Sequence, residues 1–77
     1  MVGQGDRALG EVLRARRKSR NESQEVVGFR AGLTGGTVSR IERGGSRVEW
    51  DTVRAIARAL DLRLSDLGYE IEQVERG

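Results

Sequence analysis

Residues 23–44 read SQEVVGFRAGLTGGTVSRIERG, and this stretch decides how the middle of the chain folds. Ser23 and Thr34 are typical helix N-caps, because their side-chain oxygens accept from free backbone N–H groups of the first turn. Gly32 and Gly44 can adopt the left-handed conformation that ends a helix. The stretch therefore predicts two short helices that are joined by a tight glycine turn and closed by a second glycine.

Hydrophobic spacing predicts three more helices around this pair, since the chain has no proline and no sustained strand-like alternation. The five expected helices span residues 7–20, 24–31, 35–43, 50–60 and 65–77. Asp6 is the expected cap of the first helix, and Asn21 its left-handed closing residue. The residues expected in the core are Leu9, Val12, Leu13, Val27, Ala31, Val38, Ile41, Trp50, Val53, Ile56, Ala57 and Leu60. The predicted fold class is all-α, with Trp50 as an anchor of the core.

The last expected helix carries an apolar stripe to the end of the chain. Ser65 caps this helix in the prediction, with Leu64 and Tyr69 at the two positions of a hydrophobic staple. The stripe consists of Leu67, Ile71 and Val74. It either packs on the chain's own first helix or forms a two-fold dimer interface. We favour the dimer, because a domain this small gains most from a partner.

The chain has 77 residues, and cysteine and histidine are both absent. This length indicates one domain, which we place at residues 7–77 behind a disordered segment of residues 1–6. Without these side chains the sequence offers no disulfide framework, soft-metal site, thiol nucleophile or imidazole base. We therefore expect no enzyme activity, no metal and no cofactor. No apolar run approaches the roughly 20 residues of a membrane span, so we expect no membrane association and a cytoplasmic location.

The charge of the chain is unevenly distributed, although its sum is only +2. Residues 1–47 carry ten basic and five acidic side chains, whereas residues 48–77 carry four basic and seven acidic ones. A basic first half suits contact with a polyanion, and an acidic second half leaves that end for another role. The alternative is an ordinary solvated surface with uneven charge. Contact with a polyanion gains support because the basic half includes the two short helices.

The sequence from Leu9 to Leu67 resembles the XRE family of phage-repressor and Cro-like helix-turn-helix proteins. The motifs that carry the resemblance are Ser23-Gln24-Glu25, Ala31-Gly32-Leu33, the run TVSRIERG at residues 37–44, and residues 52–67 with their IARAL centre. The resemblance implies a five-helix, usually dimeric protein that binds specific double-stranded DNA and regulates transcription. Residues 23–44 would be its helix-turn-helix and residues 65–77 its dimerisation helix.

The resemblance also implies roles for individual residues. The base-reading positions are Thr34, Gly35, Gly36, Thr37 and Arg40. The phosphate-contacting positions are Gln24, Ser39 and Arg43, to which Arg47 in the following loop is added. Solvated surface placement is the alternative for the phosphate positions, and phosphate contact without base reading is the alternative for Arg40. Arg17 and Glu42 match an internal salt bridge between the first and third helices.

Three glycines depart from the pattern of the family. Gly35 and Gly36 stand where longer, polar side chains are usual, so they indicate either a close backbone approach to DNA or a frayed helix with relaxed sequence preference. Gly28 replaces the usual alanine and either permits closer helix packing or loosens it.

The sequence as a whole predicts a homodimeric transcriptional regulator on a pseudo-palindromic operator. The alternative is an antitoxin-like module that binds a protein partner through its C-terminal helix, with DNA binding secondary. A third alternative is an RNA or general nucleic-acid binder with the same fold. Single-strand binding is disfavoured, because it needs exposed aromatic side chains for stacking and we expect none.

Overall fold

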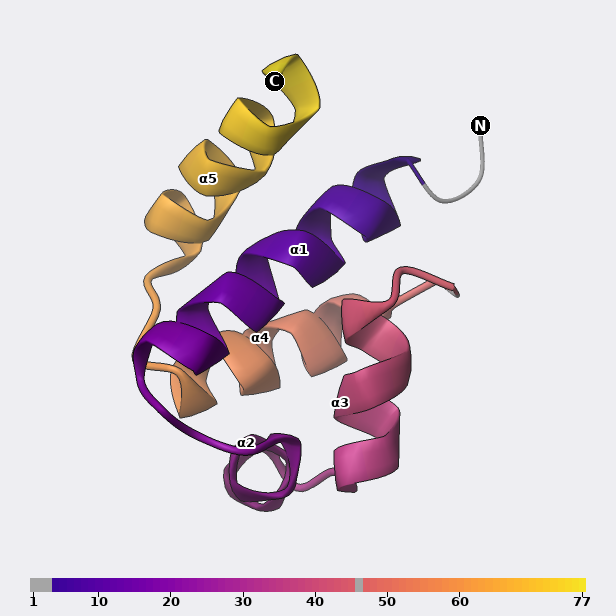
Figure 1. Cartoon of the computed structure of the whole chain (residues 1–77), viewed down its shortest axis with the longest axis vertical. Coiled ribbons are helices and arrows are strands. Elements are labelled where there is room, and N and C mark those ends of the chain that lie inside the picture. Colours follow the sequence, from indigo (N-terminus) through magenta and orange to yellow (C-terminus); the bar gives the residue numbers. More distant parts are fainter. Residues whose placement is uncertain (1–3, 46) are drawn as a thin grey trace.

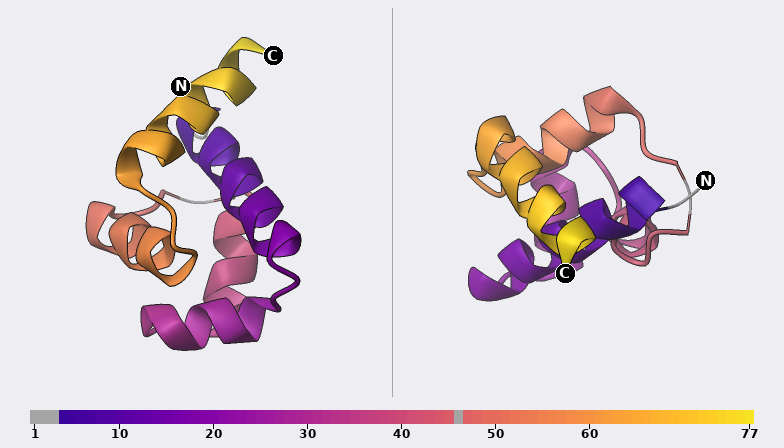
Figure 2. Two further views of the ribbon diagram at one scale, coloured as in Figure 1. Left: turned by 90° about the vertical axis from the view of Figure 1, so that its left-hand side faces the viewer. Right: turned by 90° about the horizontal axis from the view of Figure 1, so that it is seen from above.

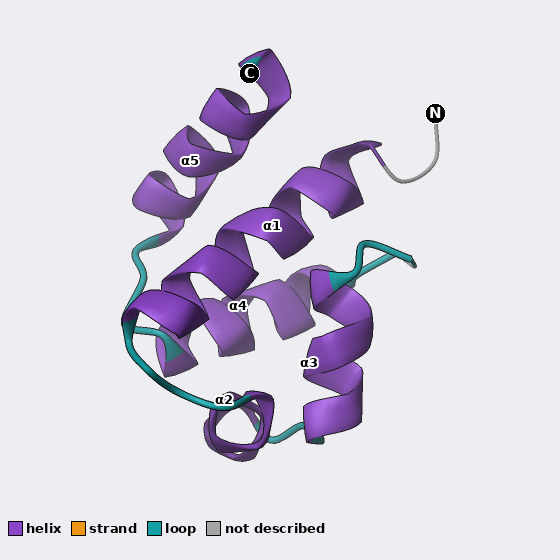
Figure 3. Cartoon of the chain, in the orientation of Figure 1, coloured by secondary structure: helices purple, strands orange, loops and turns teal. Residues whose placement is uncertain are grey.

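The computed structural model describes residues 4–45 and 47–77, which fold into five helices without a strand (Figure 1; Figure 3). The helices are α1 (Gln4–Ser19), α2 (Gln24–Ala31), α3 (Gly35–Glu42), α4 (Trp50–Ala59) and α5 (Leu64–Arg76). The all-α fold class is confirmed. The boundaries of α2 are those expected, and α3 and α4 each end one residue earlier than expected.

The helix α1 lies in the middle of the molecule, with α5 packed along one side of it and α3 against another (Figure 1; Figure 2). The helix α2 packs against both α3 and α4. All five helices contribute to one core, whose most deeply buried large side chains are Leu13, Val27, Val38 and Ile56. The short helices α2 and α3 are therefore held on a rigid support made by the other three.

The caps and turns of the α2–α3 unit are confirmed. Ser23 Oγ accepts from the backbone N–H of Val26 at 3.1 Å, and Thr34 Oγ1 accepts from that of Thr37 at 3.1 Å. Gly32 and Gly44 have φ angles of 75° and 71°. Asn21 closes α1 in the left-handed conformation, as expected, with φ of 56°. These features depend on atoms three or four residues apart, which explains why the sequence predicts them.

The start of α1 was predicted wrongly. The helix begins at Gln4, so Asp6 lies inside it rather than at its cap position. Residues 4–6 of the expected disordered segment are therefore helical, and residues 1–3 lie outside the described part of the chain.

The start of α5 was also predicted wrongly, because the helix begins before Ser65. The backbone N–H of Leu67 donates to the carbonyl oxygen of Arg63 at 2.9 Å, which makes Arg63 the N-cap without a side-chain bond. The staple positions then become Leu62 and Leu67, which are both buried. Leu64 and Tyr69 do not form the expected staple, since 42% and 63% of their surfaces are exposed.

Trp50 does not anchor the core, because 60% of its surface is exposed. Val48, in the loop that precedes α4, packs against the core near that end of the helix. The other core residues expected on α4 are buried, whereas Ala31 on α2 is only half-buried.

Two glycines allow helices to approach closely. A Cβ on Gly10 would lie 2.5 Å from the carbonyl oxygen of Ile41, so α1 touches the backbone of α3 there. A Cβ on Gly28 would lie 2.9 Å from the carbonyl carbon and oxygen of Thr34. Gly28 therefore permits close packing between α2 and the start of α3, which decides between the two interpretations of that glycine.

Candidate nucleic-acid interface

The helix α3 has one buried side and one exposed side. Val38 and Ile41 are buried, whereas Arg40 is exposed and takes part in none of the ion pairs between described residues. Gly36 precedes Arg40 by four residues, about one helical turn, so the two share the outward side. A polar helix presented in this way has the geometry of an element that enters the major groove of DNA.

The two threonines at the start of α3 bond to each other. Their hydroxyl oxygens lie 3.0 Å apart, and Thr34 Oγ1 also caps the helix. Thr34 is exposed and Thr37 is half-buried. Each hydroxyl keeps lone pairs for a further partner, but the pair is already fixed by its own hydrogen bonds.

The expected phosphate-contacting residues Gln24, Ser39 and Arg43 come together around one surface cleft. The cleft has a volume of about 310 Å³ and is lined by Arg14, Gln24, Ser39, Glu42 and Arg43. Arg43 Nη1 donates to Ser39 Oγ at 2.8 Å, and Gln24 Nε2 donates to Glu42 Oε1 at 3.1 Å. These three side chains therefore form a preorganised polar surface between α1, α2 and α3.

Arg14 is a member of this cleft that the sequence analysis missed. It is exposed on α1, far from the α2–α3 unit in sequence. The only sequence signal was the basic charge of residues 1–47, which does not distinguish Arg14 from its neighbours. Arg47, the remaining expected phosphate contact, is exposed in the loop after α3 and does not line the cleft.

Arg17 and Glu42 form an ion pair beneath this surface. Arg17 Nε lies 2.6 Å from Glu42 Oε2, and Arg17 Nη2 lies 3.0 Å from Glu42 Oε1. The side chains are 11% and 4% exposed, and the hydrogen bonds to Glu42 raise the pKa of Arg17. Because Gln24 also donates to Glu42, one buried carboxylate links α1, α2 and α3.

A second charged cluster, which the sequence analysis did not predict, joins the α1–α2 turn to α2. Glu22 accepts from Arg30 Nη2 at 2.6 Å and from Arg20 Nε at 3.0 Å. These hydrogen bonds, that of Arg30 foremost, lower the pKa of Glu22 from 4.5 to about 2. Arg30 also donates to the carbonyl oxygen of Ala59, which ties α2 to the end of α4.

The apolar stripe of α5 is largely used within the chain. Leu67 is only 3% exposed and lies in the core, so its assignment to a dimer interface was wrong. Ile71 and Val74 are half-buried and pack against the same core. Glu70 on the neighbouring side of α5 forms an ion pair with Arg16 of α1. Burial against α1 therefore accounts for Leu67 and for part of the other two side chains.

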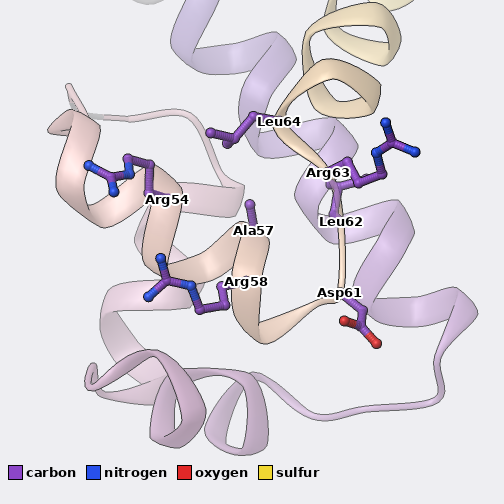
Figure 4. Close-up of a pocket in the computed structure, with 7 residues that line it drawn as sticks. All are labelled: Arg54, Ala57, Arg58, Asp61, Leu62, Arg63 and Leu64. Carbon is purple, nitrogen blue, oxygen red and sulfur yellow. The ribbon is translucent and has the colours of Figure 1, made fainter.

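A second cleft, of about 350 Å³, lies between α4 and the start of α5 (Figure 4). Arg54 and Arg58 extend from one side of α4, while Arg63 points away from them. The lining residues are Arg54, Ala57, Arg58, Asp61, Leu62, Arg63 and Leu64. None of these residues belongs to the α2–α3 unit, so this cleft is separate from the candidate DNA-binding surface.

Residues 4–45 and 47–77 contain neither a metal-binding cluster nor a membrane-spanning helix. Within these ranges, no three acidic, histidine or cysteine side chains gather closely enough to hold a metal ion. No helix there is long and apolar enough to cross a membrane.

Comparison with known proteins identifies the fold from both sequence and structure. The model of the helix-turn-helix domain family matches residues 8–67. Two crystal structures of the clp gene regulator ClgR from Corynebacterium glutamicum superimpose with TM-scores of 0.89 and 0.86, at 22% and 23% sequence identity. The first match covers 94% of this chain and 77% of the other, and the second covers 91% of both. Among curated protein sequences, none matches the chain.

Proposed function

We propose that this chain, which belongs to the helix-turn-helix domain family, is a sequence-specific DNA-binding regulator of transcription that acts as a homodimer. In such a dimer, the α3 helices of two copies enter successive major grooves of a pseudo-palindromic operator. The half-sites lie about 10 bp apart, centre to centre, or a multiple of that distance. The resemblance to the XRE family supports the same function.

The observation that carries the proposal is the position of Arg40. It is the one long side chain on the outward side of α3 between Gly36 and Arg43, and it is exposed above the buried Val38 and Ile41. A guanidinium so placed pairs with the O6 and N7 atoms of guanine in bidentate fashion, which discriminates by about 1–3 kcal/mol against other bases. Gln24, Ser39 and Arg43 line the neighbouring cleft and would contact phosphates. Such contacts fix the orientation of a helix on DNA.

A salt series of DNA binding tests this function. Genome-derived duplex fragments are bound by the parent protein and by Arg40→Ala, and the best fragment is compared with a scrambled one at each salt concentration. We expect the parent to prefer its best fragment by orders of magnitude and the variant to lose most of that preference. Equal, weak binding of every fragment by both proteins would contradict sequence-specific regulation.

The dimer is proposed to use the side of α5 that bears Leu64, Ile71 and Val74. Leu64 is 42% exposed, and the other two side chains are half-buried against the chain's own core. Leu64 and Ile71 are seven residues apart, two helical turns, so they lie on one side of α5. Leu67 belongs to the core, so the proposed dimer interface consists of Leu64, Ile71 and Val74.

Sedimentation equilibrium over a concentration series tests the dimer with a matched pair of variants. Leu64→Lys places a charge on the proposed interface, whereas Val26→Lys places one on α2 at the same exposure of 42%. We expect Leu64→Lys to weaken self-association at least tenfold and Val26→Lys to leave it unchanged. Identical association of both variants would reject this interface.

The antitoxin-like alternative assigns α5 to another protein. In that hypothesis the acidic side of α5, where Glu72 and Glu75 are exposed, binds the partner and DNA binding is secondary. It becomes the better hypothesis if the salt series shows no preference among DNA fragments.

A further inference from the structure

Glu25 of α2 lies against the first residue of α3. A Cβ built on Gly35 would lie 3.0 Å from Glu25 Cγ and 3.1 Å from both Cδ and Oε2. The acidic side chain therefore occupies the space that a side chain at position 35 would fill. Because the α2–α3 contact is close at this point, with Gly28 against the backbone of Thr34, the carboxylate lies beside the N-terminal turn of α3.

The first turn of α3 offers few reading atoms of its own. Gly35 and Gly36 carry no side chain, and a Cβ on Gly36 would meet only Thr34 Oγ1, at 3.8 Å. The hydroxyls of Thr34 and Thr37 are bonded to each other. A recognition helix contacts base edges mainly through its N-terminal residues. The part of α3 that enters a groove most deeply therefore has no long side chain of its own. Glu25 is the charged group beside it.

The carboxylate of Glu25 is available for a partner. Glu25 is exposed and belongs to none of the ion pairs found among the described residues. Near DNA it is repelled by the phosphates, so it lowers affinity for every sequence that does not offer it a donor. An unpaired acidic group at this place therefore acts against non-specific binding.

Only two base atoms in the major groove can donate to a carboxylate, the exocyclic amines of cytosine and adenine. On the major-groove edge, the amine of adenine lies between two acceptors that repel a carboxylate, its own N7 and thymine O4. The amine of cytosine has one such neighbour, guanine O6, and a C5–H group on its other side. Cytosine is therefore the base that Glu25 recognises best.

We propose that Glu25 is a specificity-determining residue that reads a cytosine from α2, through the space left open above Gly35. The inference rests on the proposed DNA-binding function and adds a reader outside the recognition helix. It also gives Gly35 a role, because any larger residue there would compete with the acidic side chain for the same space.

Selection of duplexes from a library with randomised half-sites tests the assignment. The proteins compared are the parent, Glu25→Gln, Gly35→Ala, and Glu72→Gln as a control that removes one exposed acidic charge on α5. Circular dichroism of each variant establishes that it is folded. Affinities for the selected site and for its single-base variants are then measured at one salt concentration.

We expect Glu25→Gln to lower the preference for cytosine at one position of each half-site by about tenfold to a hundredfold, and to favour adenine there, since glutamine pairs with adenine. Gly35→Ala should weaken the preference at the same position, because the added Cβ displaces the tip of Glu25. Glu72→Gln should select the parent's site.

Two results overturn the inference and are distinguishable. If the parent selects a defined site and Glu25→Gln selects the same one, Glu25 is no base reader although the proposed function stands. If the parent selects no sequence at all, the proposed function fails and the inference fails with it.

Discussion

Arg17 of α1 donates two hydrogen bonds to Glu42 at the end of α3, at 2.6 Å and 3.0 Å, and both side chains are almost fully covered. The same carboxylate accepts from Gln24 at the start of α2. One buried charge thus links α3, the start of α2 and the central helix α1. Hydrogen bonds between charged groups therefore add to hydrophobic packing in the contact between α3 and α1.

Loss of Arg17 should destabilise the fold strongly. Arg17→Ala leaves the Glu42 carboxylate buried without its counter-charge, which we expect to lower the free energy of unfolding by about 3–5 kcal/mol. Arg20→Ala, which breaks a more exposed pair with Glu22, should cost no more than about 1 kcal/mol. Urea denaturation of the two variants measures the difference. Similar losses for both would mean that the Arg17–Glu42 pair contributes no more than a surface pair.

Gly10 should not tolerate even one added methyl group. A Cβ there would lie 2.5 Å and 2.7 Å from the carbonyl oxygens of Ile41 and Glu42, so α1 and α3 must separate. We expect Gly10→Ala to lower the free energy of unfolding by about 1–3 kcal/mol. Gly68 on α5 is the control, because nothing lies within 4 Å of its added Cβ. Gly68→Ala should raise stability by roughly 0.5–1 kcal/mol, and a loss of the same size as for Gly10 would refute the argument from close contact.

The contribution of Glu22 to stability should depend on acid pH. Its pKa in the folded chain is about 2, below the ordinary value of 4.5, because Arg30 and Arg20 bond to the ionised form. The stabilisation is therefore complete above pH 4.5 and is lost as the pH falls through about 2. Melting temperatures of the parent and Glu22→Gln should differ at pH 6 and converge near pH 2. Salt should reduce the difference at pH 6, since the groups are accessible to solvent. A constant difference across this range would exclude titration of Glu22 as its cause.

Arg14 should contribute to DNA binding without contributing to sequence preference. It lines the cleft with Gln24, Ser39 and Arg43, where its guanidinium is placed for a phosphate. Arg14→Ala should weaken binding of all fragments alike and reduce the salt slope by about 0.9 for each phosphate that is no longer neutralised. Lys18→Ala is the matched control, because Lys18 is an exposed cation on the same helix outside the cleft. If the two variants bind alike, Arg14 does not bind a phosphate.

Much of the fold could be predicted because its signals are local. The caps Ser23 and Thr34 bond within one turn, and Gly32 closes α2 through its own backbone conformation. The errors at Ser65 and Trp50 arose where several residues had similar local signals. Contacts with residues distant in sequence decide which leucine starts α5. They also decide which apolar residue near α4 covers the core.

Hydrophobic periodicity and the backbone preferences of single residues were enough to predict the helical architecture and the α2–α3 turn, and short motifs carried the family resemblance. The burial of Leu67, the position of Arg14 at the candidate phosphate-binding surface and the contact of Glu25 with the space over Gly35 come from the packing of the helices. Exposure and side-chain proximity depend on how α1, α2, α3 and α5 pack together. A linear pattern cannot specify those distances, since the same residue is buried or exposed according to which helix lies beside it.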